Sequence, residues 1–233
     1  MGALLIFLSS AMTLAGADAF TGEMEVGGVA NTGNTETESL NIRITLENDS
    51  EKWRNILKMD SYYSSGSDGS ESADAQKLTI TGNSAYKYSK RGYVFTEAGY
   101  ENDRFSGYDY RVHELIGLGR TFIISEERIS LSAEAGPGGR HSKLSGGARL
   151  DELIFSASAR LRWSIGASSE FSENASVKSG GEGTVVQSVT AVKANIAGAM
   201  SMKLSFDVKW NSDAPDGKKQ TDTITSITFV HDF

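Results

Sequence analysis

The chain has 233 residues, of which 23 are Lys or Arg and 30 are Asp or Glu, so its formal net charge is −7. This mildly acidic balance argues against a nucleic-acid-binding protein, because such domains are usually basic. Cysteine is absent, which excludes disulfides, thiolate metal sites and cysteine nucleophiles. The length fits one domain or a small pair, and 25 Gly with 2 Pro fit a chain of strands and turns.

Residues 1–19 are expected to be a secretory signal peptide. Residues 3–14 (ALLIFLSSAMTL) form a sustained apolar stretch that is shorter than the roughly 20 residues of a membrane-spanning helix. Small residues at 15–19 suit a cleavage site, although no Lys or Arg precedes the apolar run. The alternative is a buried core helix. We expect an exported protein whose mature domain covers residues 20–233.

Apolar and polar residues alternate along much of the mature chain, for example in residues 40–47, 153–163 and 202–210. Successive side chains of a strand point to opposite faces of its sheet, so each of these segments has one apolar and one polar face. The pattern predicts about twelve strands, near 22–31, 35–48, 51–64, 74–88, 92–105, 108–122, 128–142, 149–164, 167–178, 183–196, 200–211 and 220–233.

Strand length and aromatic placement favour a transmembrane barrel over a water-soluble sandwich. Strands of soluble proteins usually have about 5–6 residues, and most segments here are twice as long. Aromatic residues such as Trp53, Tyr86, Trp163 and Trp210 lie near segment ends, as in the aromatic girdles of outer-membrane barrels. Tight turns alternate with longer loops near 64–73, 142–148, 179–183 and 211–219, which is typical of the same class.

The predicted fold class is therefore all-β: a single up-and-down antiparallel transmembrane β-barrel of about 12 strands. Bacterial single-chain barrels have an even number of strands, with short periplasmic turns and longer external loops. The expected location is the outer membrane of a Gram-negative bacterium, with both termini periplasmic. Outer-membrane lipid and lipopolysaccharide are the expected surroundings.

The C-terminal strand resembles the signal by which the barrel-assembly machinery recognises its substrates. The chain ends in Phe233, and Ile227, Phe229 and His231 occupy alternate positions before it. His231 takes a position that is more often aromatic or apolar in that signal. The pattern predicts the assembly machinery as a partner.

Several motifs together resemble the family of salt-induced outer-membrane proteins (YdiY-like), which is named as a domain of unknown function. They are GNTET at 33–37, YENDRF at 100–105, GYDYR at 107–111, EAGPG at 134–138, SVTA at 188–191, NSD at 211–213, TDT at 221–223 and the final DF. The segment 102–111 is the most specific, and the resemblance covers nearly the whole mature chain. It implies an outer-membrane β-barrel linked to salt or osmotic conditions, and it supplies no catalytic residue.

The polar faces of the strands are expected to line the barrel lumen, because a lipid-facing Arg or Lys at mid-depth costs about 2–4 kcal/mol. The faces of 92–105 and 183–196 stay unassigned, since these segments alternate poorly. The predicted lumen-lining residues are Arg43, Arg54, Lys58, Asp60, Arg160, Arg162, Lys203, Asp207 and Lys209.

Two interpretations of these charges remain open. They could pair across the lumen and close it, or they could line a narrow water-filled pore. Eight-stranded barrels are filled by side chains and 16–18-stranded porins are open, so about twelve strands do not decide between them. The basic excess among the assigned residues favours anions if a pore exists.

The expected function is a narrow channel for small polar or charged solutes, or an envelope protein of salt or osmotic adaptation. The alternatives are a closed structural barrel without transport and a barrel enzyme acting on lipid or peptide. His113, His141 and His231 lack metal-ligand spacing, and no stretch resembles a nucleophile motif. The acidic loop residues do not match a calcium-binding loop; these are Asp68, Glu71, Asp74, Asp213 and Asp216. No catalytic residue, metal, cofactor or nucleic-acid partner is predicted.

Overall fold

The computed structural model describes residues 20–32, 38–64, 75–103, 107–125, 128–181, 183–214 and 219–233. The expected signal peptide, the loop GNTET and the acidic residues Asp68, Glu71, Asp74 and Asp216 lie outside these residues. Among the described residues, no helix is long and apolar enough to span a membrane.

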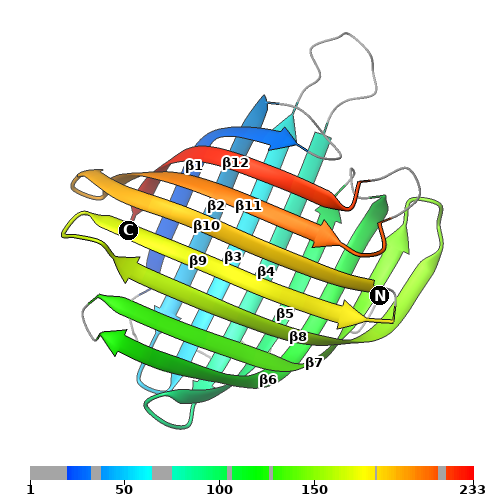
Figure 1. The fold of residues 1–233 in the computed structure, drawn as a ribbon, viewed down its shortest axis with the longest axis horizontal. Helices are drawn as coiled ribbons and strands as arrows, with labels where there is room; N and C mark the ends of the chain where they lie inside the picture. The colour runs from blue at the N-terminus through cyan, green and yellow to red at the C-terminus, as the bar shows by residue number, and fades with distance from the viewer. Residues whose placement is uncertain are drawn as a thin grey trace.

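The described residues form twelve antiparallel strands, which confirms the predicted architecture (Figure 1). The strands are β1 (Thr21–Thr32), β2 (Glu38–Asp49), β3 (Trp53–Ser64), β4 (Ala75–Lys87), β5 (Gly92–Asp103), β6 (Tyr108–Ser125), β7 (Ile129–Leu144), β8 (Arg149–Ser164), β9 (Ser169–Gly180), β10 (Gly183–Ala197), β11 (Met200–Asn211) and β12 (Thr221–Asp232). Each strand pairs with its neighbours in the chain, and β1 pairs with β12 to close the barrel.

The two rims of the barrel differ in their connections. The connections β2–β3, β4–β5, β6–β7, β8–β9 and β10–β11 lie at the rim that also holds residues 20 and 233; we call this rim the turn end, and its described turns are 50–52, 88–91, 165–168 and 198–199. At the opposite rim, the loop end, the chain passes from β1 to β2, from β3 to β4, from β5 to β6, from β7 to β8, from β9 to β10 and from β11 to β12. The expectation of a longer loop at 179–183 is wrong. β9 and β10 extend to Gly180 and Gly183, and Gly183 has a φ of +112°, a conformation that glycine adopts without steric cost.

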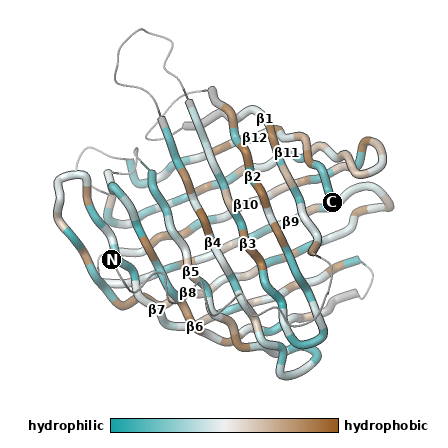
Figure 2. Tube along the Cα trace, turned by 180° about the vertical axis from the view of Figure 1, so that it is seen from behind, coloured by the Kyte–Doolittle hydropathy of each residue, from teal (hydrophilic) through white to brown (hydrophobic). Residues whose placement is uncertain are grey.

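The outer wall of the barrel is apolar. Leu153, Phe155, Leu204 and Ile227 all point outward and are more than half exposed, and Figure 2 shows hydrophobic and hydrophilic positions alternating along strands such as β2 and β3. A continuous apolar surface of this kind is unfavourable in water and suits a bilayer. Successive residues of a strand point to opposite faces of the sheet, so each lipid-facing residue is followed by one that faces the inside of the barrel.

The interior contains a compact apolar cluster beside the polar residues. Ala85, Tyr93, Phe95, Leu115 and Ile154, from β4, β5, β6 and β8, are buried together. Tyr93 and Phe95 alternate with the exposed residues Val94 and Thr96, so β5 has apolar side chains on both faces. This mixture explains why the sequence of β5 alternates poorly.

Candidate functional site in the barrel lumen

Ionised side chains from strands that are not neighbours contact one another across the lumen. Lys209 on β11 donates to Glu101 on β5 at 2.9 Å, although these strands are six positions apart in the closed order. Arg54 on β3 likewise reaches Glu134 on β7, with 3.2 Å between Nη2 and Oε1. Such contacts are possible only through the interior, so these residues face the lumen.

The loop-end half of the lumen holds a network in which charges of both signs are paired. Glu101 accepts from Arg111 at 2.6 Å as well as from Lys209, and Lys77 lies 3.5 Å from Asp103. Three of these residues, Glu101, Asp103 and Arg111, belong to or adjoin the motif segment 100–111. The contacts of Arg111 and Lys77 join neighbouring strands, whereas the contact between Lys209 and Glu101 crosses the lumen. Glu101, which immediately precedes the most specific segment 102–111, therefore supplies the acidic partner of that cross-lumen contact.

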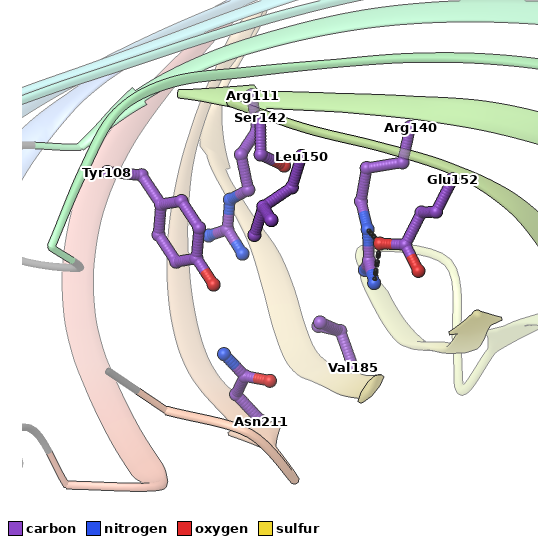
Figure 3. Close-up of a pocket in the computed structure, with 8 residues that line it drawn as sticks. All are labelled: Tyr108, Arg111, Arg140, Ser142, Leu150, Glu152, Val185 and Asn211. Carbon is purple, nitrogen blue, oxygen red and sulfur yellow. Dashed lines mark hydrogen bonds and ion pairs between the residues drawn. The ribbon is translucent and has the colours of Figure 1, made fainter. Parts of the chain in front are cut away.

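A small recess opens beside this network, and Figure 3 shows the residues that line it. The Arg111 guanidinium lies over the Tyr108 ring, 4.5 Å from its centroid. Arg140 pairs with Glu152 at 2.5 Å and donates to the Gly183 carbonyl oxygen at 3.2 Å. Both arginines of the recess, Arg111 and Arg140, are thus already paired with carboxylates of the protein, those of Glu101 and Glu152.

Glu25 on β1 is the centre of a second network, and it is 1% exposed. Its carboxylate accepts from Lys203 at 2.8 Å and from the Thr228 hydroxyl at 3.1 Å. Arg43 lies 3.5 Å from Glu25 and also donates to Asp60 on the adjacent strand. This network ties β1, β2, β3, β11 and β12 together close to the seam of the barrel.

The turn-end half of the lumen is richer in cations. Arg54 lies over the Tyr93 ring at 4.8 Å, and the Tyr93 hydroxyl donates to Glu134 at 2.9 Å. Arg160 on β8 donates to the side-chain oxygen of Asn174 at 3.0 Å, which is a neutral partner.

Lys58 and Arg162 differ from the other lumen cations. Both side chains are exposed, and neither forms an ion pair or hydrogen bond within the described part of the chain. Lys58 lies in the middle of β3, between two lipid-facing residues, Leu57 and Met59. Its charge interacts with those of Arg160 and Arg162. Lys58 is directed away from lipid in the middle of a closed wall, so its exposed surface faces the space inside the barrel.

The histidines lie in three different settings, and His231 is the one at the turn end, where its ring contacts that of Phe233 with 6.2 Å between the centroids. His113 is directed inward and contacts Glu97 at 3.0 Å and Lys178 at 2.8 Å. His141 lies on the outer wall near the loop end, where it contacts Asp151 at 2.7 Å and Glu114 at 3.1 Å. In the described residues these partners are carboxylates and an ammonium group, whereas a serine-hydrolase histidine contacts a nucleophilic hydroxyl. Within the same part of the chain, no group of three or more His, Asp or Glu side chains could hold a metal ion.

The structure brings only some of the predicted lumen residues together. Arg43 pairs with Asp60, whereas Lys209 pairs with Glu101 rather than with the nearby Asp207. Asp207 instead accepts from the Gln187 amide at 2.9 Å.

The sequence interpretation missed the acidic partners in the lumen, which are Glu23, Glu25, Glu97, Glu101 and Glu134. They offset the basic excess of the assigned residues over most of the interior. Glu23 and Glu25 alternate with Met24 and Val26 in β1, and this pattern could have assigned them to the inner face. Glu97 and Glu101 lie in the poorly alternating segment 92–105.

Comparison with known proteins agrees with this architecture. A family model described as "Protein of unknown function, DUF481" matches residues 24–233. The chain belongs to the DUF481 family. A relative of this DUF481 chain, the uncharacterized protein YdiY of Escherichia coli (strain K12), is 27% identical over 212 residues, which cover 90% of this chain and 81% of that protein.

Solved structures with the same fold as this DUF481 chain are outer-membrane barrels. The NanC porin superposes with a TM-score of 0.60 at 9% identity, over 89% of this chain and 98% of that one. An outer-membrane channel from Pseudomonas putida F1 gives 0.54 at 9% identity, over 94% and 97%. The translocator domain of the autotransporter NalP from Neisseria meningitidis gives 0.54 at 10% identity, over 99% and 94%. At these identities the likeness shows the fold alone.

Proposed function

We propose that this protein is a narrow outer-membrane channel for small polar or charged solutes, with the turn end in the periplasm and the loop end outside the cell. The observation that carries the proposal is Lys58 in the middle of β3, which is exposed and has no ion-pair partner among the described residues. A lumen plugged by side chains would bury this ammonium without a partner, and a buried unpaired charge costs several kcal/mol. Interior water around Lys58 removes that cost, and it supplies a path for small solutes.

Conductance of the purified barrel in planar lipid bilayers tests this proposal. We expect discrete current steps above the lipid background in potassium chloride, because the charged lumen is hydrated. A sample unfolded by heating in detergent is the control, and it should give no steps. If the folded protein also gives none across several salts, the channel proposal fails.

The alternative of a closed structural barrel is favoured by a different observation. Lys209 and Glu101 link opposite walls at the loop end, and such a link narrows the lumen there. The same bilayer experiment separates the two functions, since a closed barrel conducts nothing. Replacing Lys209 with Ala would raise the conductance if the link narrows an open path, and would change nothing in a closed barrel.

We also propose how the barrel meets its membrane surroundings. Lipopolysaccharide would face the loop end of the outer wall, where the charged residues Glu114, His141 and Asp151 lie next to the apolar Leu153. The barrel-assembly machinery would bind the outward-facing residues at the end of β12. There Ile227 and Phe229 are more than half exposed.

Replacement of Phe233 by Ala is expected to lower the amount of folded barrel in the outer membrane several-fold. Phe233 is 65% exposed, and its ring lies beside Gly22 and contacts that of His231 with 6.2 Å between the centroids, so most of what the change removes is exposed aromatic surface. The measurement is heat-modifiable gel mobility in outer-membrane fractions. Refolding of the same variant into detergent is the control and should match the unchanged protein. An equal loss in both assays would contradict a role in recognition.

A further inference from the structure

We propose that Lys58, Arg160 and Arg162 form an anion-binding site in the turn-end half of the lumen, which accepts small solutes that carry a carboxylate or a phosphate group. The inference rests on the proposed channel function, and it deepens that function by naming the class of solute.

The three cations come from opposite parts of the wall. Lys58 lies on β3, whereas Arg160 and Arg162 lie on β8, five positions away in the closed strand order. The charge of Lys58 nevertheless interacts with those of both arginines and of Arg43. Because β3 and β8 are not neighbours, this interaction acts through the lumen. The cations therefore surround the space through which a solute would pass.

Among the described residues, no carboxylate is hydrogen-bonded or ion-paired to Lys58, Arg160 or Arg162. Arg160 is bonded to the neutral Asn174 side chain, and Lys58 and Arg162 have no bonded partner among the described residues. The carboxylate whose charge acts on Lys58 is that of Glu97, and the one whose charge acts on Arg160 is that of Glu134. Each of these carboxylates is already paired with another cation. Lys178 lies 3.2 Å from Glu97, and Arg54 lies 3.2 Å from Glu134.

Three cations that share one space repel one another, and an anion between them would remove the repulsion. The planar guanidinium group of arginine presents two parallel N–H donors, which match the oxygens of a carboxylate or a phosphate. Rings of Arg and Lys are also the means by which pores select anions. The chemistry of the donors therefore specifies an oxyanion and no particular carbon skeleton.

In the loop-end half of the lumen and near the seam, by contrast, the cations are paired with carboxylates. At the loop end Arg111, Lys77 and Lys209 are each bonded to Glu101 or Asp103, so their charges are offset within the fold. Near the seam Lys203 is bonded to Glu25. A solute that enters from the loop end would first pass paired charges and would then meet the unpaired cations. Selectivity is thus assigned to one half of the barrel.

The test measures reversal potentials of the full barrel in planar bilayers under a potassium chloride gradient. The unchanged protein is expected to be anion-selective. Each of the variants Lys58→Gln and Arg162→Gln is expected to lower the chloride-to-potassium permeability ratio about fivefold, the effect of removing one charge several ångströms from the path. The matched control is Lys90→Gln, which removes an exposed charge from the turn between β4 and β5 and should leave the ratio unchanged.

Added succinate and inorganic phosphate are then compared as blockers of the chloride current, which distinguishes a site for carboxylates from a site for phosphate. Whichever anion binds should block at low concentration, and its apparent Kd should rise about tenfold in Lys58→Gln/Arg162→Gln, since two of the three cations are gone. If the barrel conducts but is cation-selective, or if the variants match Lys90→Gln, the anion site is wrong and the channel stands.

A barrel without conductance overturns the channel itself, and the site is then tested by stability. Phosphate or succinate should raise the unfolding temperature of the unchanged protein in detergent, because a ligand that binds the folded state stabilises it. The double variant Lys58→Gln/Arg162→Gln should show no such rise. Equal rises in both proteins would overturn the anion site independently of transport.

Discussion

Replacement of Gly27 by Val is expected to prevent the barrel from closing. Gly27 lies opposite Thr228 at the β1–β12 seam, and a Cβ atom at this position would lie 2.0 Å from the Ile227 carbonyl oxygen and 2.6 Å from the Thr228 Cα. Both are backbone atoms, so neither can move aside without breaking the pairing of the two strands. Overpacking in a core costs about 1–3 kcal/mol, but an open seam also leaves backbone groups unpaired in lipid, at several kcal/mol each.

The neighbouring residue supplies a matched control. Gly28 lies on the same strand and is exposed on the outer wall, and a Cβ atom there would meet nothing within 4 Å. Gly28→Val should therefore fold like the unchanged protein, whereas Gly27→Val should give almost no heat-modifiable species on gels after refolding. Equal folded fractions for the two variants would contradict the steric account of the seam.

The strands could be predicted where the wall separates lipid from a polar interior. In β2 and β11 the apolar residues face out and the polar residues face in, so the sequence alternates with the period of the backbone. β5 does not alternate in this way, because Tyr93 and Phe95 pack inside the barrel with Leu115. Hydropathy reports the face of a residue only when the two faces have different surroundings.

The charged lumen could be predicted, but its pairing could not. Alternation assigns Lys209 to the inner face, yet its partner Glu101 lies 108 residues earlier in the chain and on the opposite wall. Which inward residues meet depends on the register of every strand pair around the barrel, and the sequence of one strand does not contain that information. For the same reason the sequence could not indicate that Lys58 would have no partner in the part of the chain that the structure describes.

Replacement of Glu25 by Gln is expected to destabilise the folded barrel by about 3–5 kcal/mol, the usual cost of removing one partner from a buried ion pair. The change keeps the size of the side chain and removes the charge that Lys203 and Arg43 share. Arg43 keeps Asp60 as a partner, whereas among the described residues Lys203 keeps only Glu23, at 3.5 Å. Most of the lost stability should therefore come from Lys203, because its ammonium group loses its nearer carboxylate.

Urea unfolding of the refolded barrel measures this loss. Asp49→Asn is the control, because it breaks the pair with Lys87 at the exposed turn end and should cost no more than about 1 kcal/mol. Lys203→Met in the Glu25→Gln background should recover part of the stability, since it removes the ammonium left without its carboxylate, and the pair should be strongly non-additive. Additive effects would mean that Lys203 finds water or another acid when Glu25 is gone, and that the lumen near the seam is as hydrated as the space around Lys58.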